Sequence, residues 1–368
     1  MDIVVLAGDG IGPEITEATV TVLAALNSSH SLALEIDRQE VGLRSLKSHG
    51  TTLPNPVRNR VQAAAGFILG PLSTYQYPLR AVGGLNPSHE FRIGLELFAN
   101  VRPSRSRPYR KSGMDLVVVR ENTEGFYASR AMHDGSGEFM PDADSAFALR
   151  KITRKASQRV ARVAFETARG RRRKVSVVHK ANVLRLSEGL FLESVRQVAA
   201  DYGDVELEEV LVDAVAALLV RAPARFDVIV TTNMFGDILS NEAAELSGGL
   251  GMAPSLNIGP RHAMAQASHG SAPDIAGRNQ ANPTGLMLST AMLLEWLGHK
   301  HHRTDIAAAA ECFSEAVEGT LENPATRTAD LKGPLGTREF AEAVAGAVLR
   351  SASNQQEVAP VPIALRQG

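Results

Sequence analysis

The sequence contains only one cysteine, Cys312, among its 368 residues. A single cysteine cannot form a disulfide within the chain, and it cannot supply a cysteine metal cluster. Both kinds of site are therefore excluded, and we expect a reducing, cytoplasmic setting.

Long hydrophobic runs and an excess of charge are also missing. No apolar run reaches the ~18 residues that a membrane span needs, and the N-terminal MDIVVLAGDG is too short to be a signal peptide. The net charge is −1, so there is no global basic field that would attract nucleic acid. A basic run, RGRRRK at 169–174, is interpreted as a solvated turn between a helix and a strand. We therefore expect neither nucleic acid nor a membrane as a partner.

The chain does contain apolar, strand-like runs that alternate with helical patterns. This alternation is typical of an α/β protein with a largely parallel core, and the length allows two lobes. Strands are predicted at 3–7, 66–70, 115–121, 175–179, 205–213 and 226–232, and helices at 13–26 and 286–297. Gly-, Pro- and Asp-rich stretches predict loops at 82–90, 133–145 and 247–283, and a mobile tail is predicted at 353–368.

The first glycine-rich segment, GDGIGPE at 8–14, follows a strand and opens a helix. Its glycines read G-x-G-x-G rather than the G-x-G-x-x-G of a Rossmann turn, and Glu35 lies too near to be the ribose-binding acid. Glu14 in the first helical turn would also repel a pyrophosphate. We interpret the segment as a structural strand–turn–helix near a ligand.

The second glycine-rich segment is HGSAPDIAGRNQANP at 269–283. Its glycines allow tight turns in which backbone N–H groups can face phosphates. Asp274 lies within the segment, and an acid near an adenosine ribose accepts hydrogen bonds from the hydroxyls and repels a 2′-phosphate. If this segment binds a dinucleotide, we expect NAD rather than NADP. The alternative is a long irregular surface loop.

Three arginines accompany the predicted strands: Arg92 and Arg102 in EFRIGLELFANVRP, and Arg120 at the end of DLVVVRE. A guanidinium matches a carboxylate with two parallel hydrogen bonds, so converging arginines would suit a di- or tricarboxylate. Taken singly, an arginine is more often a surface residue or a member of a structural ion pair.

Further candidates follow the predicted strands, where α/β folds place their ligands. Tyr127 and Lys180 are candidates for proton transfer, and Asp213 and Asp237 offer hard oxygen ligands for Mg²⁺ or Mn²⁺. In a helix, Asp237 and Asn241 of GDILSNEA would lie one turn apart on one face, followed by Glu245. Such a face is either part of a metal site or an ordinary solvated stripe.

Seven motifs occur in a characteristic order: GDGIGPE, FANVRP, VRENTEGFY, HKANVL, VDA, NMFGDILS and HGSAPDIAG followed by ANPTG. On these motifs the chain resembles the β-decarboxylating dehydrogenases, the isocitrate/3-isopropylmalate dehydrogenase family. The resemblance extends from residue 1 to about residue 350.

The resemblance implies two α/β lobes that share one large mixed sheet, and not a Rossmann fold. Residues 1–94 plus 249–368 would form the lobe that carries the NAD segment, and 95–248 the lobe with the dimer interface and metal site. An arm at about 128–148 would clasp a second copy. The family forms homodimers with shared active sites, so Lys180 and Asp213 would come from the partner.

The implied reaction is the NAD- and Mg²⁺- or Mn²⁺-dependent oxidation and decarboxylation of a 2-hydroxy acid that carries a carboxylate on C3. Lys180 would accept the hydroxyl proton, and Tyr127 would deliver a proton to the enolate carbon. The other implied roles are substrate binding by Ser88, Arg92, Arg102 and Arg120, cofactor binding by His269, Gly270, Asp274, Ile275 and Asn282, and metal binding by Asp213, Asp237 and Asn241.

Two positions depart from the family pattern. The family usually has aspartate where this chain has Asn241, and an amide oxygen brings one less negative charge to a cation. This predicts metal binding that is weaker or more dependent on Mn²⁺. In LNPSHEFR at 85–92, Asn86 and Ser88 make the pocket more polar than an isopropylmalate pocket, which favours an isocitrate-like substrate. Homoisocitrate, 3-isopropylmalate, D-malate and tartrate remain open.

An alternative to the enzyme is a non-catalytic regulatory subunit of a homologous dehydrogenase. The loss of a metal ligand, as at Asn241, would be consistent with such a subunit. The presence of Lys180, Tyr127, Asp213 and Asp237 favours the enzyme.

Overall fold

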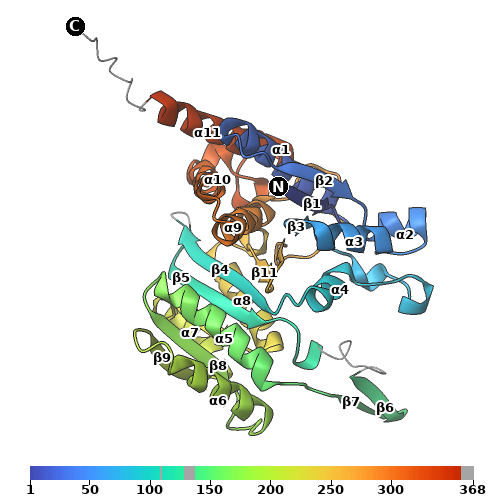
Figure 1. Ribbon diagram of the computed structural model, residues 1–368, viewed down its shortest axis with the longest axis vertical. Coiled ribbons are helices and arrows are strands. Elements are labelled where there is room, and N and C mark those ends of the chain that lie inside the picture. Colours follow the sequence, from blue (N-terminus) through green and yellow to red (C-terminus); the bar gives the residue numbers. More distant parts are fainter. Residues whose placement is uncertain (108–109, 128–136, 358–368) are drawn as a thin grey trace.

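The structure, a computed structural model, describes residues 1–107, 110–127 and 137–357. A ten-stranded sheet runs through the molecule in the order β2-β1-β3-β12-β11-β4-β5-β10-β8-β9 (Figure 1). The two ends of the sheet are parallel, whereas β4 pairs antiparallel with both β5 and β11. The predicted α/β class with a large mixed sheet is confirmed.

The strands form where short runs of β-branched and other apolar residues are covered by helices. Both faces of β1 are buried, as expected for a parallel strand between two helical layers. The strands of the large sheet are β1 (Asp2–Leu6), β2 (Glu35–Gln39), β3 (Gly66–Leu69), β4 (Ala99–Arg107), β5 (Arg110–Glu121), β8 (Lys174–His179), β9 (Glu206–Leu211), β10 (Val228–Thr231), β11 (Leu256–Ile258) and β12 (Ala263–Ala265). A separate hairpin consists of β6 (Glu138–Asp142) and β7 (Ser145–Ala148).

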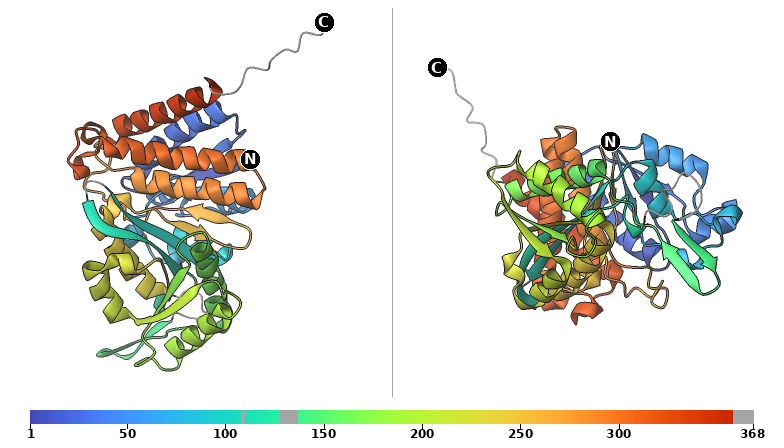
Figure 2. Two further views of the ribbon diagram at one scale, coloured as in Figure 1. Left: turned by 90° about the vertical axis from the view of Figure 1, so that its left-hand side faces the viewer. Right: turned by 90° about the horizontal axis from the view of Figure 1, so that it is seen from below.

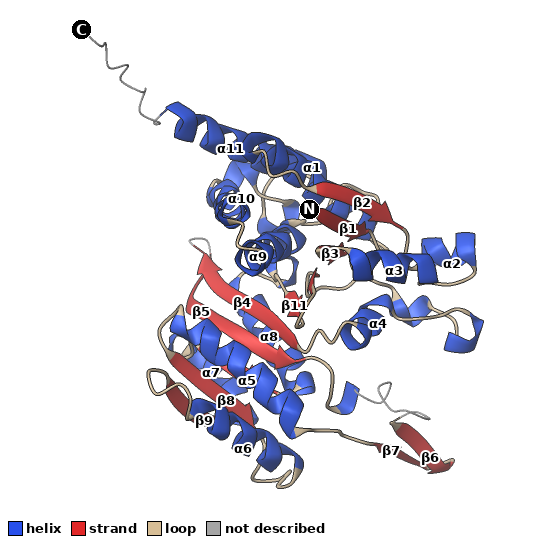
Figure 3. Ribbon diagram, viewed as in Figure 1, coloured by secondary structure: helices blue, strands red, loops and turns tan. Residues whose placement is uncertain are grey.

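Helices cover both faces of the sheet (Figure 3). The helices are α1 (Gly12–His30), α2 (Leu43–His49), α3 (Asn55–Ala63), α4 (Pro87–Gly94), α5 (Arg154–Arg169), α6 (Ser187–Ala199), α7 (Val212–Arg221), α8 (Asn233–Ser247), α9 (Thr284–Lys300), α10 (Thr304–Glu322) and α11 (Thr337–Glu357). At one end of the sheet, α1, α9, α10 and α11 share a core on one face (Figure 2), and α3 and α4 pack on the other. At the other end, α5 and α6 cover one face and α7 and α8 cover the opposite one.

The order of the strands follows the two parts of the chain. Strands β1, β2, β3, β11 and β12 lie at one end of the sheet, and β4, β5, β8, β9 and β10 lie at the other. The first group comes from 1–94 and 249–368, and the second from 95–248. The division into lobes at these residues remains a prediction.

Each strand and helix predicted from the sequence is present, with corrections at two ends, whereas β2, β4, β11 and β12 were not predicted. The loop predicted at 82–90 contains the start of α4, because Asn86 caps the helix by accepting the N–H of His89 at 3.2 Å. The strand predicted at 205–213 ends at Leu211, and Asp213 lies in the first turn of α7.

Three other stretches predicted as loops or as a tail are only partly irregular. The loop predicted at 247–283 was wrong at β11 and β12, two three-residue runs that pair with β4 and β3 in the large sheet. The stretch 133–145 contains β6, while its residues up to 136 lie outside the described part of the chain. The predicted tail at 353–368 begins as the end of α11, and 358–368 are not among the described residues.

Candidate active site

A cavity of about 700 Å³ lies where α4, β4, β5 and α8 meet the segment that follows β12. Eight of the site residues predicted from the sequence line it: Ser88, Arg92, Arg102, Arg120, Tyr127, Asp237, His269 and Gly270. The sheet places Arg102 and Arg120 close together because β4 and β5 pair along Asn100↔Arg120 and Arg102↔Val118.

Two buried arginines converge on one carboxylate. Arg102 donates a hydrogen bond to Asp237 at 3.1 Å, and Arg120 donates a short hydrogen bond to the same oxygen. Burial alone would raise the pKa of Asp237, but the positive charges of Arg120, Arg102 and Arg92 outweigh it and hold this pKa below its ordinary value. Asp237 therefore stays ionised at neutral pH.

The arginines carry more positive charge than Asp237 can balance. Burial, together with repulsion from Arg120, lowers the pKa values of Arg92 and Arg102 to about 9, and burial also lowers the pKa of Arg120. Within the described residues, Arg92 forms no ion pair, and its buried Nε has no hydrogen-bond partner. A bound anion would stabilise these charges, so the cavity is suited to a ligand with several carboxylates.

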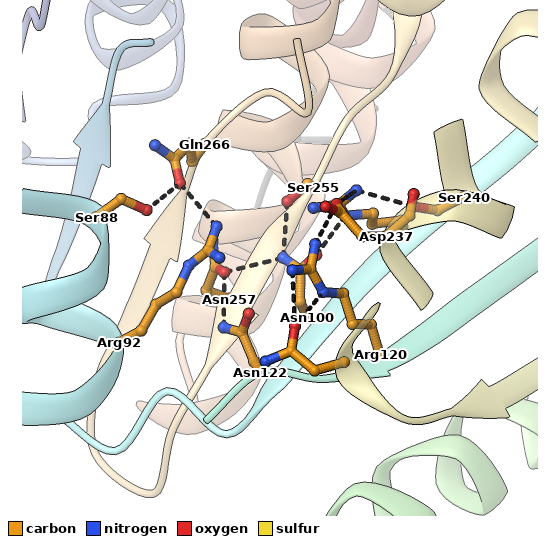
Figure 4. Close-up of polar contacts among 12 residues, drawn as sticks. Ser88, Arg92, Asn100, Arg120, Asn122, Asp237, Ser240, Ser255, Asn257 and Gln266 are labelled. Carbon is orange, nitrogen blue, oxygen red and sulfur yellow. Dashed lines mark hydrogen bonds and ion pairs between the residues drawn. The ribbon is translucent and has the colours of Figure 1, made fainter. Parts of the chain in front are cut away.

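A layer of amides holds the arginines in place (Figure 4). Asn233 Oδ1 accepts hydrogen bonds from Nε and Nη2 of Arg120 at 2.9 and 2.7 Å, and Asn100 Oδ1 accepts from Nε of Arg102. Asn257 Oδ1 in turn accepts from the amide of Asn100 at 2.9 Å. Asn100 and Asn233 lie in the FANVRP and NMFGDILS motifs, but they were not singled out because their contacts join segments that are distant in the sequence.

Gln266 is a further residue that the sequence did not single out. It is buried directly after β12, and its Oε1 accepts hydrogen bonds from Ser88 Oγ at 2.8 Å and from Arg92 Nη2 at 3.2 Å (Figure 4). Ser88 and Arg92 are one turn apart on α4, so both face the cavity from one side of that helix. Gln266 therefore fixes the polar wall that α4 contributes.

Tyr127 lies at the edge of the cavity and is 46% exposed. The guanidinium carbon of Arg120 lies 5.7 Å from the centre of its ring, which is within the range of a cation–π contact. The phenol is thus near the anion-binding arginines and open to solvent on its other side.

Lys180 and Asp213 do not line this cavity. Lys180 directly follows β8, Asp213 lies in the first turn of α7, and the two form an ion pair with Nζ 2.6 Å from Oδ1. The hydrogen bond from Lys180 lowers the pKa of Asp213. Within one chain, Lys180 and Asp213 are therefore separate from the eight predicted residues that line the cavity.

The segment GDILSNEA is helical and forms part of α8. Asp237 faces the cavity, and Asn241 follows one turn later with a buried Oδ1 that has no hydrogen-bond partner. In the described residues, no group of three or more His, Cys, Asp or Glu side chains is arranged to hold a metal ion. Asp237 and Asn241 offer two hard oxygens that fit Mg²⁺ or Mn²⁺, but a complete site needs ligands from elsewhere.

The two glycine-rich segments contact each other. Glu14 accepts backbone N–H groups of Asn279 at 3.3 Å and Ala281 at 3.1 Å, and it also accepts the hydroxyl of Thr337. The N–H of Ile11 donates to the carbonyl of Ser271 at 2.8 Å. GDGIGPE is thus a support for the 269–283 segment, in agreement with the structural interpretation.

The predicted cofactor residues lie along this second segment. His269 has a buried Nε2 without a partner, and burial lowers its pKa, which favours the neutral imidazole. Asp274 is exposed and Ile275 is partly exposed. Asn282 is buried, donates to Asp330 at 2.9 Å and accepts the N–H of Thr284 at 3.0 Å. The segment therefore exposes Asp274 to solvent and places the unpaired Nε2 of His269 beside the cavity.

The basic run 169–174 joins α5 to β8, and most of its charges are paired. Arg171 bonds to Asp115 and Asp227, Arg169 to Asp204, and Lys174 to Glu206 and Glu208. The described part of the chain contains no helix that is long and apolar enough to cross a membrane.

The fold and the cavity define an α/β protein built to bind a small, multiply charged anion. Residues 2–344 match the family model for isocitrate/isopropylmalate dehydrogenase. The chain belongs to this family of dehydrogenases, whose members act on small hydroxy acids.

Relatives with similar identity have different names. An isocitrate/homoisocitrate dehydrogenase from Thermus thermophilus is 43% identical over 94% of this chain and 98% of the relative. A 3-isopropylmalate dehydrogenase from Archaeoglobus fulgidus is 41% identical over 93% and 98%. The crystal structure of an isocitrate dehydrogenase from Methylococcus capsulatus has a TM-score of 0.84 and 39% identity, and covers 95% of this chain and 99% of that one. Overall identity thus does not separate the possible substrates.

Proposed function

We propose that the protein is an NAD- and Mg²⁺- or Mn²⁺-dependent dehydrogenase that oxidises and decarboxylates a 2-hydroxy acid with a carboxylate on C3. The observation that carries the proposal is the cluster of Arg92, Arg102 and Arg120 around a polar cavity, in which Asp237 pairs with Arg102 and Arg120 only. Three guanidinium groups can hold two or three carboxylates in fixed positions.

The substrate is proposed to be isocitrate or a related 3-substituted malate. Asn86, Ser88 and His89 line the part of the cavity next to Arg92. A wall of this kind is better suited to a polar group on C3 than to an isopropyl group, because burying polar side chains against an apolar group without hydrogen bonds is unfavourable. Homoisocitrate, 3-isopropylmalate, D-malate and tartrate are the competing substrates.

When bound, the divalent cation stabilises negative charge on the substrate oxygens, and NAD is the hydride acceptor. Asp237 and Asn241 would hold the cation together with Asp213 of the partner subunit. The 269–283 segment would hold NAD through His269, Gly270, Ile275 and Asn282, and Asp274 would bind the adenosine ribose. The orphaned oxygen of Asn241 and the orphaned Nε2 of His269 fit these roles.

Two side chains would move protons in a homodimer with shared active sites. Lys180 of the partner subunit accepts the proton of the substrate hydroxyl, and Tyr127 donates a proton to the carbon from which CO₂ has left. Two features support the dimer: Lys180 and Asp213 lie outside their own cavity, and the β6–β7 hairpin exposes Phe139, Met140 and Phe147. In this proposal the hairpin is the arm that clasps the partner, and the lobes divide at residues 94 and 248.

The test is NADH formation by the purified full chain with Mn²⁺. The substrate panel consists of isocitrate, homoisocitrate, 3-isopropylmalate, D-malate and tartrate, with NADP and metal-free reactions as controls. One strong substrate with NAD supports the proposal, and turnover that requires NADP contradicts the assignment of Asp274. Activity without added metal, retained after chelation, contradicts the metal assignment.

A second candidate function is a non-catalytic regulatory subunit, favoured by Asn241 in place of the aspartate usual in the family. Turnover by the pure protein alone would exclude it. If the chain is silent on the whole panel and copurifies with a catalytic homologue, the regulatory role is favoured.

A further inference from the structure

A fully buried carboxylate lies behind the Lys180 turn. Glu188 is in the first turn of α6 and has no exposed surface. A buried charge is retained only when it is paired and hydrogen-bonded. Oε1 of Glu188 is paired with the guanidinium of Arg150 and accepts the hydroxyl of Thr232 at 3.3 Å.

The second oxygen of Glu188 holds the backbone of Lys180. Oε2 accepts the Lys180 N–H at 3.0 Å. The carbonyl of Lys180 accepts the N–H groups of Val183 at 3.0 Å and Leu184 at 2.9 Å. Both backbone groups of Lys180 are therefore fixed, and its side chain leaves from a defined position toward Asp213.

Arg150 also contacts the segments that build this chain's own cavity. Its guanidinium lies 5.5 Å from the ring centres of Phe126 and Phe235, and Phe126 precedes Tyr127. Its hydrogen bond to Thr232, at 3.0 Å, reaches the residue before Asn233, which holds Arg120. The Glu188–Arg150 pair thus lies between the Lys180 turn and the arginine cluster.

We propose that Glu188 is a positioning residue for Lys180 and acts on the active site of the partner subunit. The inference rests on the proposed function, in which Lys180 serves the active site of the partner subunit and Tyr127 serves the active site of its own chain. The direct hydrogen bond to the Lys180 backbone supports this assignment, whereas the links to Phe126 and Asn233 pass through Arg150 and Thr232.

The test uses hybrid dimers of full chains that carry two different affinity tags, so that each hybrid can be purified. A hybrid of Lys180→Met and Tyr127→Phe contains one site with intact Tyr127 and Lys180, and about half of the wild-type activity is expected. This pair tests the proposed sharing of sites by itself. If it shows no recovery, the proposed function is wrong at that point, independently of Glu188.

The variant Glu188→Gln then shows on which site Glu188 acts. As a homodimer it should lose activity by roughly 10- to 100-fold, mainly in kcat, because a misplaced base slows the proton transfer. In a hybrid with Tyr127→Phe, about half of the wild-type activity should return, whereas a hybrid with Lys180→Met should stay inactive. Glu193→Gln is the matched control, because Glu193 pairs with Arg154 on the exposed side of α6.

Each other outcome overturns the inference. Recovery with Lys180→Met but not with Tyr127→Phe would place the action of Glu188 in its own cavity. Recovery with neither would indicate a purely structural role, and so would a loss of activity in Glu193→Gln as large as in Glu188→Gln. If Glu188→Gln does not fold, Glu188→Asp is used in the same hybrids, since it keeps the charge for Arg150 and shortens the reach to Lys180.

Discussion

Nζ of Lys180 lies 2.6 Å from Oδ1 of Asp213 in the same chain, and neither residue lines the cavity that contains Tyr127 and Asp237. A lysine and an aspartate that pair outside the cavity of their own chain can serve a cavity only if a second copy approaches. The first prediction therefore concerns the surface that would bring the copies together.

Phe147→Asp should convert the protein to a monomer and abolish its activity. Phe139 and Phe147 stack on the exposed hairpin with ring centres 5.2 Å apart, and a buried interfacial charge at this place would be unpaired. Size-exclusion chromatography with light scattering measures the mass. Tyr75→Asp is the control, because Tyr75 is 70% exposed and lies far from the hairpin in the sequence. A dimeric Phe147→Asp variant would contradict the proposed arm.

Asn241→Asp should tighten Mn²⁺ and Mg²⁺ binding by roughly tenfold, since a carboxylate adds a negative charge to the two-oxygen set of α8. Isothermal titration of the metal-free protein with each cation gives the affinities without reference to turnover. Asn59→Asp introduces the same charge on the exposed face of α3 and should change neither affinity. Unchanged or weaker binding in Asn241→Asp would remove this residue from the metal site.

Arg92→Lys should raise KM for the substrate and lower kcat/KM by roughly 10- to 100-fold. Lysine keeps the positive charge but loses the planar fork that bonds to Gln266 and to a carboxylate at once. Steady-state kinetics on the active substrate measures the effect. Arg261→Lys, at an exposed arginine outside the cavity, should behave like the wild type. If Arg92→Lys also leaves KM unchanged, Arg92 does not bind the substrate.

Glu90→Gln should lower the free energy of unfolding at neutral pH by about 1 kcal/mol. It should also make this free energy fall less steeply as the pH is lowered into the acid range. Burial alone would raise the pKa of Glu90, but hydrogen bonds from Arg80 and Arg58 hold it below the ordinary value of 4.5. A depressed folded-state pKa gives stabilisation that is fully present above the unfolded pKa. It is lost as pH falls through the folded pKa, so the window lies below about pH 4.5.

Urea unfolding of the wild type and of Glu90→Gln from pH 7 to pH 3 gives the comparison. The difference between the two proteins should shrink as the pH falls below 4.5. Glu17→Gln is the control, because Glu17 pairs with Arg38 at an exposed site. A difference that stays constant over this range would show that Glu90 is not ionised when folded, or is not held by its arginines.

Six of the ten strands of the large sheet could be predicted because each is a short buried apolar run, whereas β4, which carries Arg102 and is rich in arginine and serine, was missed. β1, β3, β5, β8, β9 and β10 all fall within the predicted ranges or beside them. The start of α4 was missed because Asn86 and Pro87 are typical of loops as well as of helix starts, and only the observed cap at His89 decides between them. The end of β9 was missed because α7 follows without a loop, so the apolar pattern continues to Asp213.

The cavity residues could be named from motifs, but their mutual contacts could not. Arg120 ends a strand and was recognisable as a buried charge that needs a partner. Its partners Asn233 and Asp237 follow another strand, and Gln266 follows β12, which has only three residues. Such contacts depend on the order of strands in the sheet, and no local periodicity contains that order.

The pairing of β3 with β12 has a consequence for synthesis on the ribosome. β3 ends at Leu69 and β12 at Ala265 of 368 residues, so the neighbour that covers the open edge of β3 does not exist until well over two-thirds of the chain has been translated. All of β4, β5, β8, β9 and β10 emerge in the meantime and can pair among themselves. β3, one of the first strands to leave the ribosome, is therefore among the last to obtain both neighbours, and its open edge is a part of the nascent chain that needs protection from aggregation.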